Sequence, residues 1–137
     1  MPEEELTIVI NQAPYVGERA WNGLRLAITA LAMNMKVNIF LIDDGIYVAR
    51  TGQKPPDDTP NLEELLKRCL SMGGKVKVCG SCVDSRGFEP EKEEFGVCFI
   101  GKKDGGLTPG DLVEGVKMGS MMELTEWIKD SQKVVSF

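Results

Sequence analysis

The sequence predicts an α/β protein in which helices cover both faces of a parallel sheet. Short runs rich in β-branched residues alternate with stretches whose apolar residues recur at helical spacing. The short runs are nearly continuous in apolar character, as strands buried on both faces are. The chain has 137 residues, 42% of them hydrophobic, which suits one domain with one core. We therefore expect residues 1–137 to form a single domain.

The N-terminal part of the chain predicts two strands separated by a long helix. The first strand is expected at residues 6–10, and the turn-forming run 11–14 ends it. From residue 15 to 35, apolar residues recur every three or four positions, which predicts a helix with a wide apolar face. A second strand is expected at 36–42, closed by the turn signal Asp43-Asp44-Gly45.

The middle of the chain predicts a loop, a helix and a third strand. Two adjacent prolines within the polar run 52–60 exclude a regular element there. Asn61 is a favourable N-cap, and Glu64 three residues later suits a partial capping box. A glycine pair at 73–74 can supply the left-handed residue that ends this helix. A strand at 75–78 then leads the chain to the cysteine that follows it.

The C-terminal third begins with the least regular pattern. Residues 89–106 contain a charge run, an apolar run and a turn, which indicates an insertion. A β-hairpin arm and an ordinary extra strand fit this stretch equally well. A short strand is expected at 112–118, and Ser120 with Glu123 forms a capping box ahead of a last helix. A final strand is expected at 133–137.

Charge and composition exclude several classes of function. The formal net charge of −5 argues against a nucleic-acid backbone or an anionic membrane as the main partner. No apolar run approaches the roughly 20 residues that a membrane span needs. The acidic start Glu3-Glu4-Glu5 is unlike a signal peptide, so we expect a cytoplasmic protein. The chain has no histidine, which removes catalytic histidine dyads and triads; we expect no cofactor and no bound metal.

Residues capable of chemistry follow three of the predicted strands. Asn11 and Tyr15 come after the first strand, Asp43 after the second and Cys79 after the third. Because the carboxyl ends of parallel strands lie at one edge of a sheet, we expect these residues on one rim. For the Asp43-Asp44 pair, a solvated turn is favoured over a general base or a metal site.

The strongest candidate site is the pair Cys79 and Cys82. In a reducing compartment, cysteines are expected as thiols, metal ligands or redox groups. A thiol at the end of a strand and before a helix start meets exposed backbone amides, which favour the thiolate. Arg86, if it folds back, would add a positive charge. The Cys82 thiol can donate a hydrogen bond to that thiolate or resolve a mixed disulfide.

The four cysteines of the chain also admit other roles. Cys69 aligns with leucines on a helix face, and Cys98 lies in an apolar run, so packing is favoured for both. Cys-x-x-Cys is half of a zinc knuckle, but the second half is missing. A thioredoxin-like dithiol would also start a helix, but the usual aromatic residue before the motif and the facing cis-proline are not evident.

Several runs along the chain carry a family resemblance. The most specific are Cys79-Gly80-Ser81-Cys82-Val83-Asp84-Ser85-Arg86-Gly87 and Gly115-Val116-Lys117-Met118-Gly119-Ser120. Further matching runs lie at 11–15, 22–28, 50–55, 123–127 and 133–137. In these runs the chain resembles the DsrE-like sulfur-relay proteins and, within them, the YchN-like branch.

The resemblance implies a three-layer α/β/α domain with a five-stranded parallel sheet of order 4-3-2-1-5. It also implies a homo-oligomer, a trimer or hexamer, and sulfur donor and acceptor proteins as partners. In relay members, a cysteine followed seven residues later by Arg and then Gly carries the persulfide. That pattern selects Cys79 with Arg86 and Gly87, whereas Cys82 is a feature of the YchN-like branch. Residues 89–106 are longer than the family pattern suggests.

The sequence therefore predicts a persulfide carrier of sulfurtransferase type, with the sulfane sulfur on Cys79 and with Cys82 and Arg86 assisting. The residues expected to bind substrate or partner are Asn11, Tyr15, Asp43 and Gly87. One alternative is a non-catalytic assembly or regulatory subunit, because the fold alone confers no activity and some family members lack the cysteine. Another is an oxidoreductase that uses Cys79 and Cys82 as a dithiol.

Overall fold

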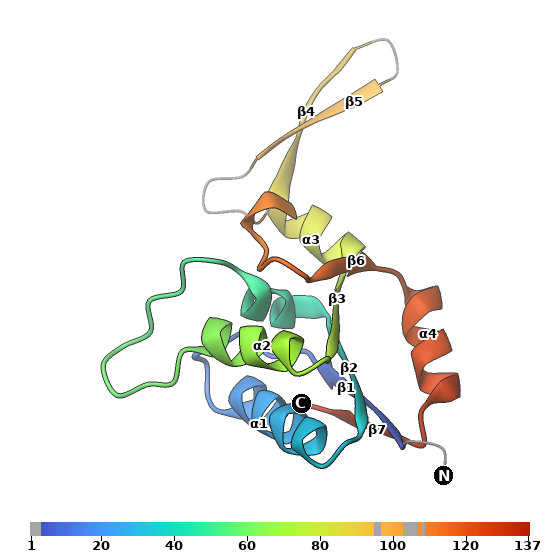
Figure 1. Ribbon diagram of the computed structural model, residues 1–137. Coiled ribbons are helices and arrows are strands. Elements are labelled where there is room, and N and C mark those ends of the chain that lie inside the picture. The colour runs from blue at the N-terminus through green and yellow to red at the C-terminus, as the bar shows by residue number, and fades with distance from the viewer. Residues whose placement is uncertain (1–3, 95–96, 103–106, 108) are drawn as a thin grey trace.

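The main sheet of the protein has five parallel strands (Figure 1). The computed structural model describes residues 4–94, 97–102, 107 and 109–137. Across the sheet, the strands are β6 (Lys117–Gly119), β3 (Lys75–Cys79), β2 (Lys36–Leu41), β1 (Glu5–Ile10) and β7 (Lys133–Ser136). Counted along the chain within this sheet, the order is 4-3-2-1-5. The predicted fold class and strand order are therefore confirmed.

Helices lie on both faces of this sheet (Figure 1). The helices α1 (Arg19–Ala32) and α2 (Leu62–Ser71) pack together on one face, and α4 (Met121–Asp130) covers part of the other. The helix α3 (Gly80–Gly87) continues directly from the C-terminal end of β3. Among the helices in the described ranges, none has the length and apolar character needed to cross a membrane.

The strands direct alternate residues into two separate cores, because successive side chains point to opposite faces of a sheet. The larger core lies on the α1 and α2 side and includes Ile39 and Val78 with Leu24 of α1. The smaller core lies on the α4 side and consists of Phe40, Cys79 and Leu124, with Trp127 packed against it. The candidate cysteine thus lies on the thinner, α4-covered face.

The first helix is shorter than predicted, beginning at Arg19 rather than at Tyr15. Tyr15 and Gly17 have positive φ angles of 68° and 82°, which a right-handed helix does not accommodate. Val16 between them is 61% exposed instead of lying on the apolar face. The apolar spacing that predicted a longer helix is therefore partly coincidental.

The strand predicted at 112–118 is wrong in its bounds, because β6 covers only Lys117–Gly119. Leu112 instead forms an isolated antiparallel bridge with Arg50. Gly115 has a φ of 97°, which interrupts extended backbone before β6 can begin. The remaining short elements are the 3₁₀ helices η1 (Asp43–Ala49), where the sequence indicated a turn, and η2 (Pro109–Asp111).

Both predicted helix caps are present. Asn61 Oδ1 accepts a hydrogen bond from the Glu64 amide at 3.2 Å, and Ser120 Oγ accepts one from the Glu123 amide at 3.2 Å. The second half of the Ser120 capping box is replaced, because the Glu123 carboxylate lies 2.7 Å from Lys77 Nζ. The Glu123 side chain therefore pairs with a lysine of β3, whereas the capping-box motif predicts a hydrogen bond to the backbone N–H of Ser120.

A two-stranded antiparallel sheet follows α3. Its strands are β4 (Phe88–Glu94) and β5 (Val97–Lys102), and it forms a hairpin that projects away from the layered body (Figure 1). Of the two interpretations of residues 89–106, the backbone matches the hairpin arm. Residues 95, 96 and 103–106 lie outside the described ranges. The description of this stretch as an insertion stays a prediction, as does the single-domain assignment of residues 1–137.

Candidate functional site

Cys79 lies where β3 ends and α3 begins. The strand's apolar residues end at this position, and the helix starts at Gly80 without an intervening loop. Cys79 is 3% exposed and packs with Phe40 and Leu124. This placement puts the sulfur just below the surface at the C-terminal edge of the sheet, where the partial positive charge of the first helical turn is largest.

Hydrogen-bond donors surround the Cys79 sulfur. Its Sγ lies 3.3 Å from Ser81 Oγ. Burial acts to raise the pKa of Cys79, but hydrogen bonds from the Cys82 thiol, from the Ser81 hydroxyl and from the two backbone amides outweigh it. The pKa of Cys79 is therefore lowered. The thiolate is the reactive form of cysteine, and the lowered pKa increases the thiolate fraction of Cys79 near neutral pH.

Cys82 plays the complementary part in this pair. Burial and the hydrogen bond that its thiol donates to Cys79 raise the pKa of Cys82. Two weaker influences lower it: the backbone N–H of Asp43, which donates to Cys82 Sγ at 3.3 Å, and the charge of Arg86. The two thiols therefore divide their roles, with Cys79 favoured as the thiolate and Cys82 as the thiol donor.

Arg86 binds the two carboxylates that follow β2. Its Nη2 lies 2.6 Å from Asp43 Oδ1, and its Nε lies 3.1 Å from Asp44 Oδ1. Its Nη1 also donates to the Cys82 carbonyl at 3.2 Å. The guanidinium group therefore joins η1 to α3, and its charge is balanced by carboxylates. The predicted contact between Arg86 and the Cys79 thiolate is not found among the described residues.

The other predicted site residues lie in different surroundings. The Tyr15 hydroxyl donates to Gln53 Oε1 at 2.6 Å and accepts from the Leu62 amide at 3.1 Å, so it holds the loop before α2. The backbone amide of Asn11 donates to the carbonyl of the C-terminal residue at 2.8 Å. Gly87 is the last residue of α3. Tyr15 is therefore bound to the α2 side of the rim, apart from the thiol contacts described above.

Two contributors to the site were missed by sequence reasoning. Ser81 was noted only as part of the motif, yet its hydroxyl is a partner of the Cys79 sulfur. The backbone amide of Asp43 was missed because no side-chain pattern reveals it. Asp43 has a φ of 56°, a left-handed conformation that aspartate tolerates better than most residues.

Cys69 and Cys98 are the two cysteines outside the Cys79 and Cys82 pair. Cys69 is fully buried in the larger core, and burial raises its pKa to about 11, which fits the predicted packing role. The side chain of Cys98 lies outside the described residues. Within the described part of the chain, the cysteines are free thiols, and no group of three or more metal-ligating side chains comes together.

The different pKa shifts of the two thiols predict that two substitutions of Cys82 affect the pKa of Cys79 differently. Cys82→Ala removes a donor to the Cys79 sulfur and is expected to raise the pKa of Cys79. Cys82→Ser keeps a hydroxyl donor in that place and is expected to leave this pKa closer to that of the wild type. The pH dependence of alkylation, followed for the Cys79 peptide by mass spectrometry, measures both. Equal pKa values in the two variants would exclude the hydrogen bond as the cause.

Nearly the whole chain is similar to known proteins. A model of the DsrE/DsrF-like family matches residues 4–137. An uncharacterised protein of Methanocaldococcus jannaschii is 40% identical over 133 residues, covering 97% of this chain and 99% of the relative. Another, from Methanopyrus kandleri, is 39% identical over 132 residues, covering 96% and 93%.

Structural comparison agrees with this result. YchN of Escherichia coli is 29% identical over 136 residues, covering 98% of this chain and 99% of YchN. The YchN crystal structure superposes on this chain with a TM-score of 0.78. A conserved protein from Bacteroides thetaiotaomicron, 19% identical, superposes with a TM-score of 0.62 over 98% of this chain and 95% of its own, and shares the fold.

Proposed function

The chain belongs to the DsrE/DsrF-like family, a family of the sulfur-relay type, and we propose that it carries sulfane sulfur as a persulfide on Cys79. The observation that carries this proposal is the position of the Cys79 thiol where β3 passes into α3, with Ser81 Oγ 3.3 Å from its sulfur, and the lowered pKa of Cys79 agrees with it. Hydrogen-bond donors that favour the thiolate would also favour the anionic form of a persulfide on this cysteine, whose charge lies on the outer sulfur, one bond beyond Sγ.

The proposed loading step is a thiolate attack. The Cys79 thiolate attacks the outer sulfur of a persulfide on a donor protein, and the donor's sulfur–sulfur bond breaks. The donor leaves as a thiolate, and Cys79 keeps the transferred sulfur as a persulfide anion. No external oxidant or reductant is required, because one sulfur–sulfur bond replaces another.

Delivery can follow two routes from this persulfide. A thiolate on an acceptor protein attacks the outer sulfur, which returns Cys79 to its thiolate form. Alternatively, Cys82 attacks the inner sulfur, which releases hydrosulfide and leaves a disulfide between Cys79 and Cys82. The second route then needs a thiol reductant to restore the pair. The position of Cys82 beside Cys79 supports this assisting role.

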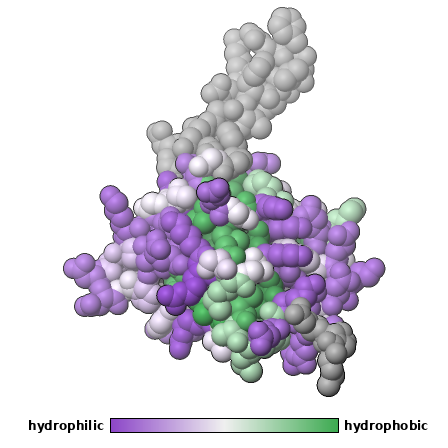
Figure 2. Space-filling model, in the orientation of Figure 1, coloured by the Kyte–Doolittle hydropathy of each residue, from purple (hydrophilic) through white to green (hydrophobic). Residues whose placement is uncertain are grey.

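The proposal includes partners and surroundings. Family members act in sulfur relay with partner proteins, so a sulfur donor and an acceptor are expected here. A reducing cytoplasm would keep the thiols free between transfers. A homo-oligomer, a trimer or hexamer, is supported by the exposed methionines Met118, Met121 and Met122 near β6 and α4. Figure 2 also shows hydrophobic residues gathered down the middle of one face between hydrophilic flanks, and such patches often mark an interface.

Intact mass spectrometry of the reduced protein after incubation with a sulfane donor tests this function. Peptide mapping is expected to find an added mass of about 32 Da, one sulfur atom, on the Cys79 peptide. Sulfur on other peptides alone would contradict the assignment of Cys79 as the carrier.

A second candidate function is favoured by the contact between the two thiols. Cys79 and Cys82 lie three residues apart where β3 passes into α3, and the Cys82 thiol helps to lower the pKa of Cys79, which suits a dithiol oxidoreductase. In the same experiment that function gives a loss of two protons, with Cys79 joined to Cys82 and no sulfur added. If neither change occurs, the non-catalytic assembly or regulatory subunit becomes the better account.

A further inference from the structure

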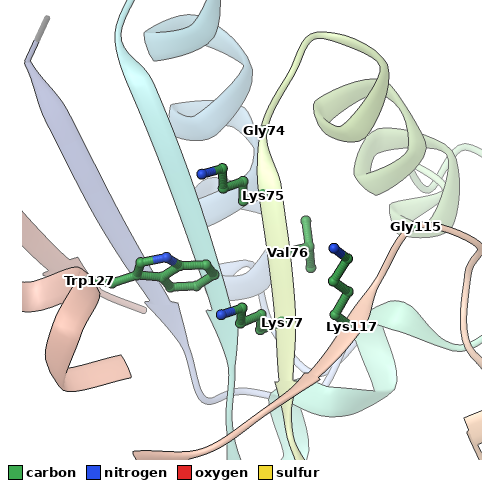
Figure 3. Close-up of a pocket in the computed structure, with 7 residues that line it drawn as sticks. All are labelled: Gly74, Lys75, Val76, Lys77, Gly115, Lys117 and Trp127. Atoms are coloured by element: carbon green, nitrogen blue, oxygen red, sulfur yellow. The ribbon is translucent and has the colours of Figure 1, made fainter. Parts of the chain in front are cut away.

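A pocket separate from the thiols lies on the α4-covered face of the sheet (Figure 3). It has a volume of about 300 Å³. Its walls include Lys75 and Lys77 from β3, Lys117 from β6 and Trp127 from α4. This volume is at the lower end of the range for small-molecule sites, enough for a compact ligand.

The three lysines are brought together by the register of the sheet. Lys75 and Lys77 lie two residues apart on β3, so their side chains share one face. Lys117 is the direct neighbour of Lys77 in the pairing of β3 with β6. Like charges at directly paired positions destabilise a sheet. In a chain of net charge −5, the three lysines thus concentrate positive charge on one face of the sheet.

The local charge is only partly compensated by the protein. Lys77 Nζ lies 2.7 Å from Glu123 Oε2 and 4.8 Å from the centre of the Trp127 ring. Within the described part of the chain, Lys75 and Lys117 form no ion pair with a carboxylate. Lys75 and Lys117 therefore add to the pocket two positive charges that no carboxylate of the described residues pairs with at ion-pair distance. A ligand with two negative charges would therefore match it.

We propose that this pocket binds the phosphoryl group of a small phosphate compound, inorganic phosphate or a phosphate monoester. A monoester carries about −1.5 to −2 charges near neutral pH, which matches the uncompensated charge of the lysines. Lysine ammonium groups serve as point charges for phosphate. Cys79 lies two residues beyond Lys77 on the same face of β3, roughly 7 Å along the strand. The bound anion would thus border the thiol site.

Trp127 provides the measurement of binding. The chain has two tryptophans, so Trp21→Phe leaves Trp127 as the single tryptophan fluorophore. Reduced protein with this substitution is titrated at constant ionic strength with inorganic phosphate and, separately, with adenosine monophosphate. A saturable change in Trp127 fluorescence is expected. A bound anion attracts the Lys77 ammonium group and so changes its cation–π contact with the Trp127 ring. Equal affinities would identify the phosphoryl group as sufficient, and tighter binding of the monoester would identify an organic phosphate.

Charge-removing variants decide whether the pocket is the site. Lys75→Gln and Lys117→Gln are each expected to weaken binding by about tenfold, the loss of one charge-assisted contact. Lys54→Gln removes the same charge from the exposed loop before α2 and is expected to leave the affinity unchanged. A linear, unsaturable response, or equal weakening by Lys54→Gln, would overturn the proposal. The assay needs no sulfur donor, so its outcome is independent of the persulfide chemistry on Cys79.

Discussion

Cys79→Ser is expected to abolish sulfur loading from a sulfane donor. The serine hydroxyl occupies nearly the same space but stays protonated near neutral pH, so the nucleophile is lost while packing against Phe40 and Leu124 is largely kept. The added mass of about 32 Da should therefore disappear from the intact protein. Intact mass spectrometry with peptide mapping measures the loss directly.

The matched control for this substitution is Cys69→Ser. Cys69 is fully buried, and its pKa of about 11 keeps it protonated, so loading should persist in this variant. A buried hydroxyl can destabilise the core, so thermal unfolding is recorded, and Cys69→Ala serves if the serine variant is partly unfolded. Equal loading of Cys79→Ser and Cys69→Ser would refute Cys79 as the carrier.

Gly45→Ala is expected to destabilise the protein strongly. A β-carbon at this position would overlap the carbonyl oxygen of Ile10 and lie 2.7 Å from its carbonyl carbon. Both atoms belong to the backbone of a buried strand and cannot move aside cheaply. We expect the free energy of unfolding to fall by about 3 kcal/mol, measured by urea denaturation followed by circular dichroism.

Gly52→Ala provides the comparison for that loss. Gly52 has a φ of 78°, and nothing lies within 4 Å of a β-carbon built there. The alanine variant should lose only the cost of a left-handed residue, about 1 kcal/mol. Equal losses in the two variants would show that the close approach of η1 to β1 is not rigid. Because η1 also holds the Asp43 amide against Cys82, Gly45→Ala should in addition raise the pKa of Cys82.

Local patterns predicted much of the fold because they report local physics. The strand at 6–10 and the caps at Asn61 and Ser120 depend on residues close together in the chain. The order of the strands came from the family resemblance and agrees with the structure. Predictions based on apolar spacing failed where glycine or tyrosine adopts a positive φ, as before α1 and before β6. Spacing alone does not report such backbone conformations.

The candidate site was likewise predicted from the sequence only in part. The sequence placed Cys79 at a strand end before a helix start, which the motif and the apolar run together indicate. It did not predict the partner of Arg86, because Asp43 and Asp44 lie more than forty residues away along the chain. Only the folded arrangement of η1 beside α3 shows that the guanidinium binds these carboxylates.

The sequence by itself determined the fold class, the family and the identity of the candidate thiol, since each depends on residue type and spacing. The tertiary structure decided which groups act on that thiol. A pKa depends on burial and on donors within a few ångströms, and these donors include the Cys82 thiol and the Ser81 hydroxyl. It likewise decided that Lys77 and Lys117 lie side by side, because strand register joins residues forty positions apart. Periodicity in the chain reports which face is buried, and only packing reports which charges meet.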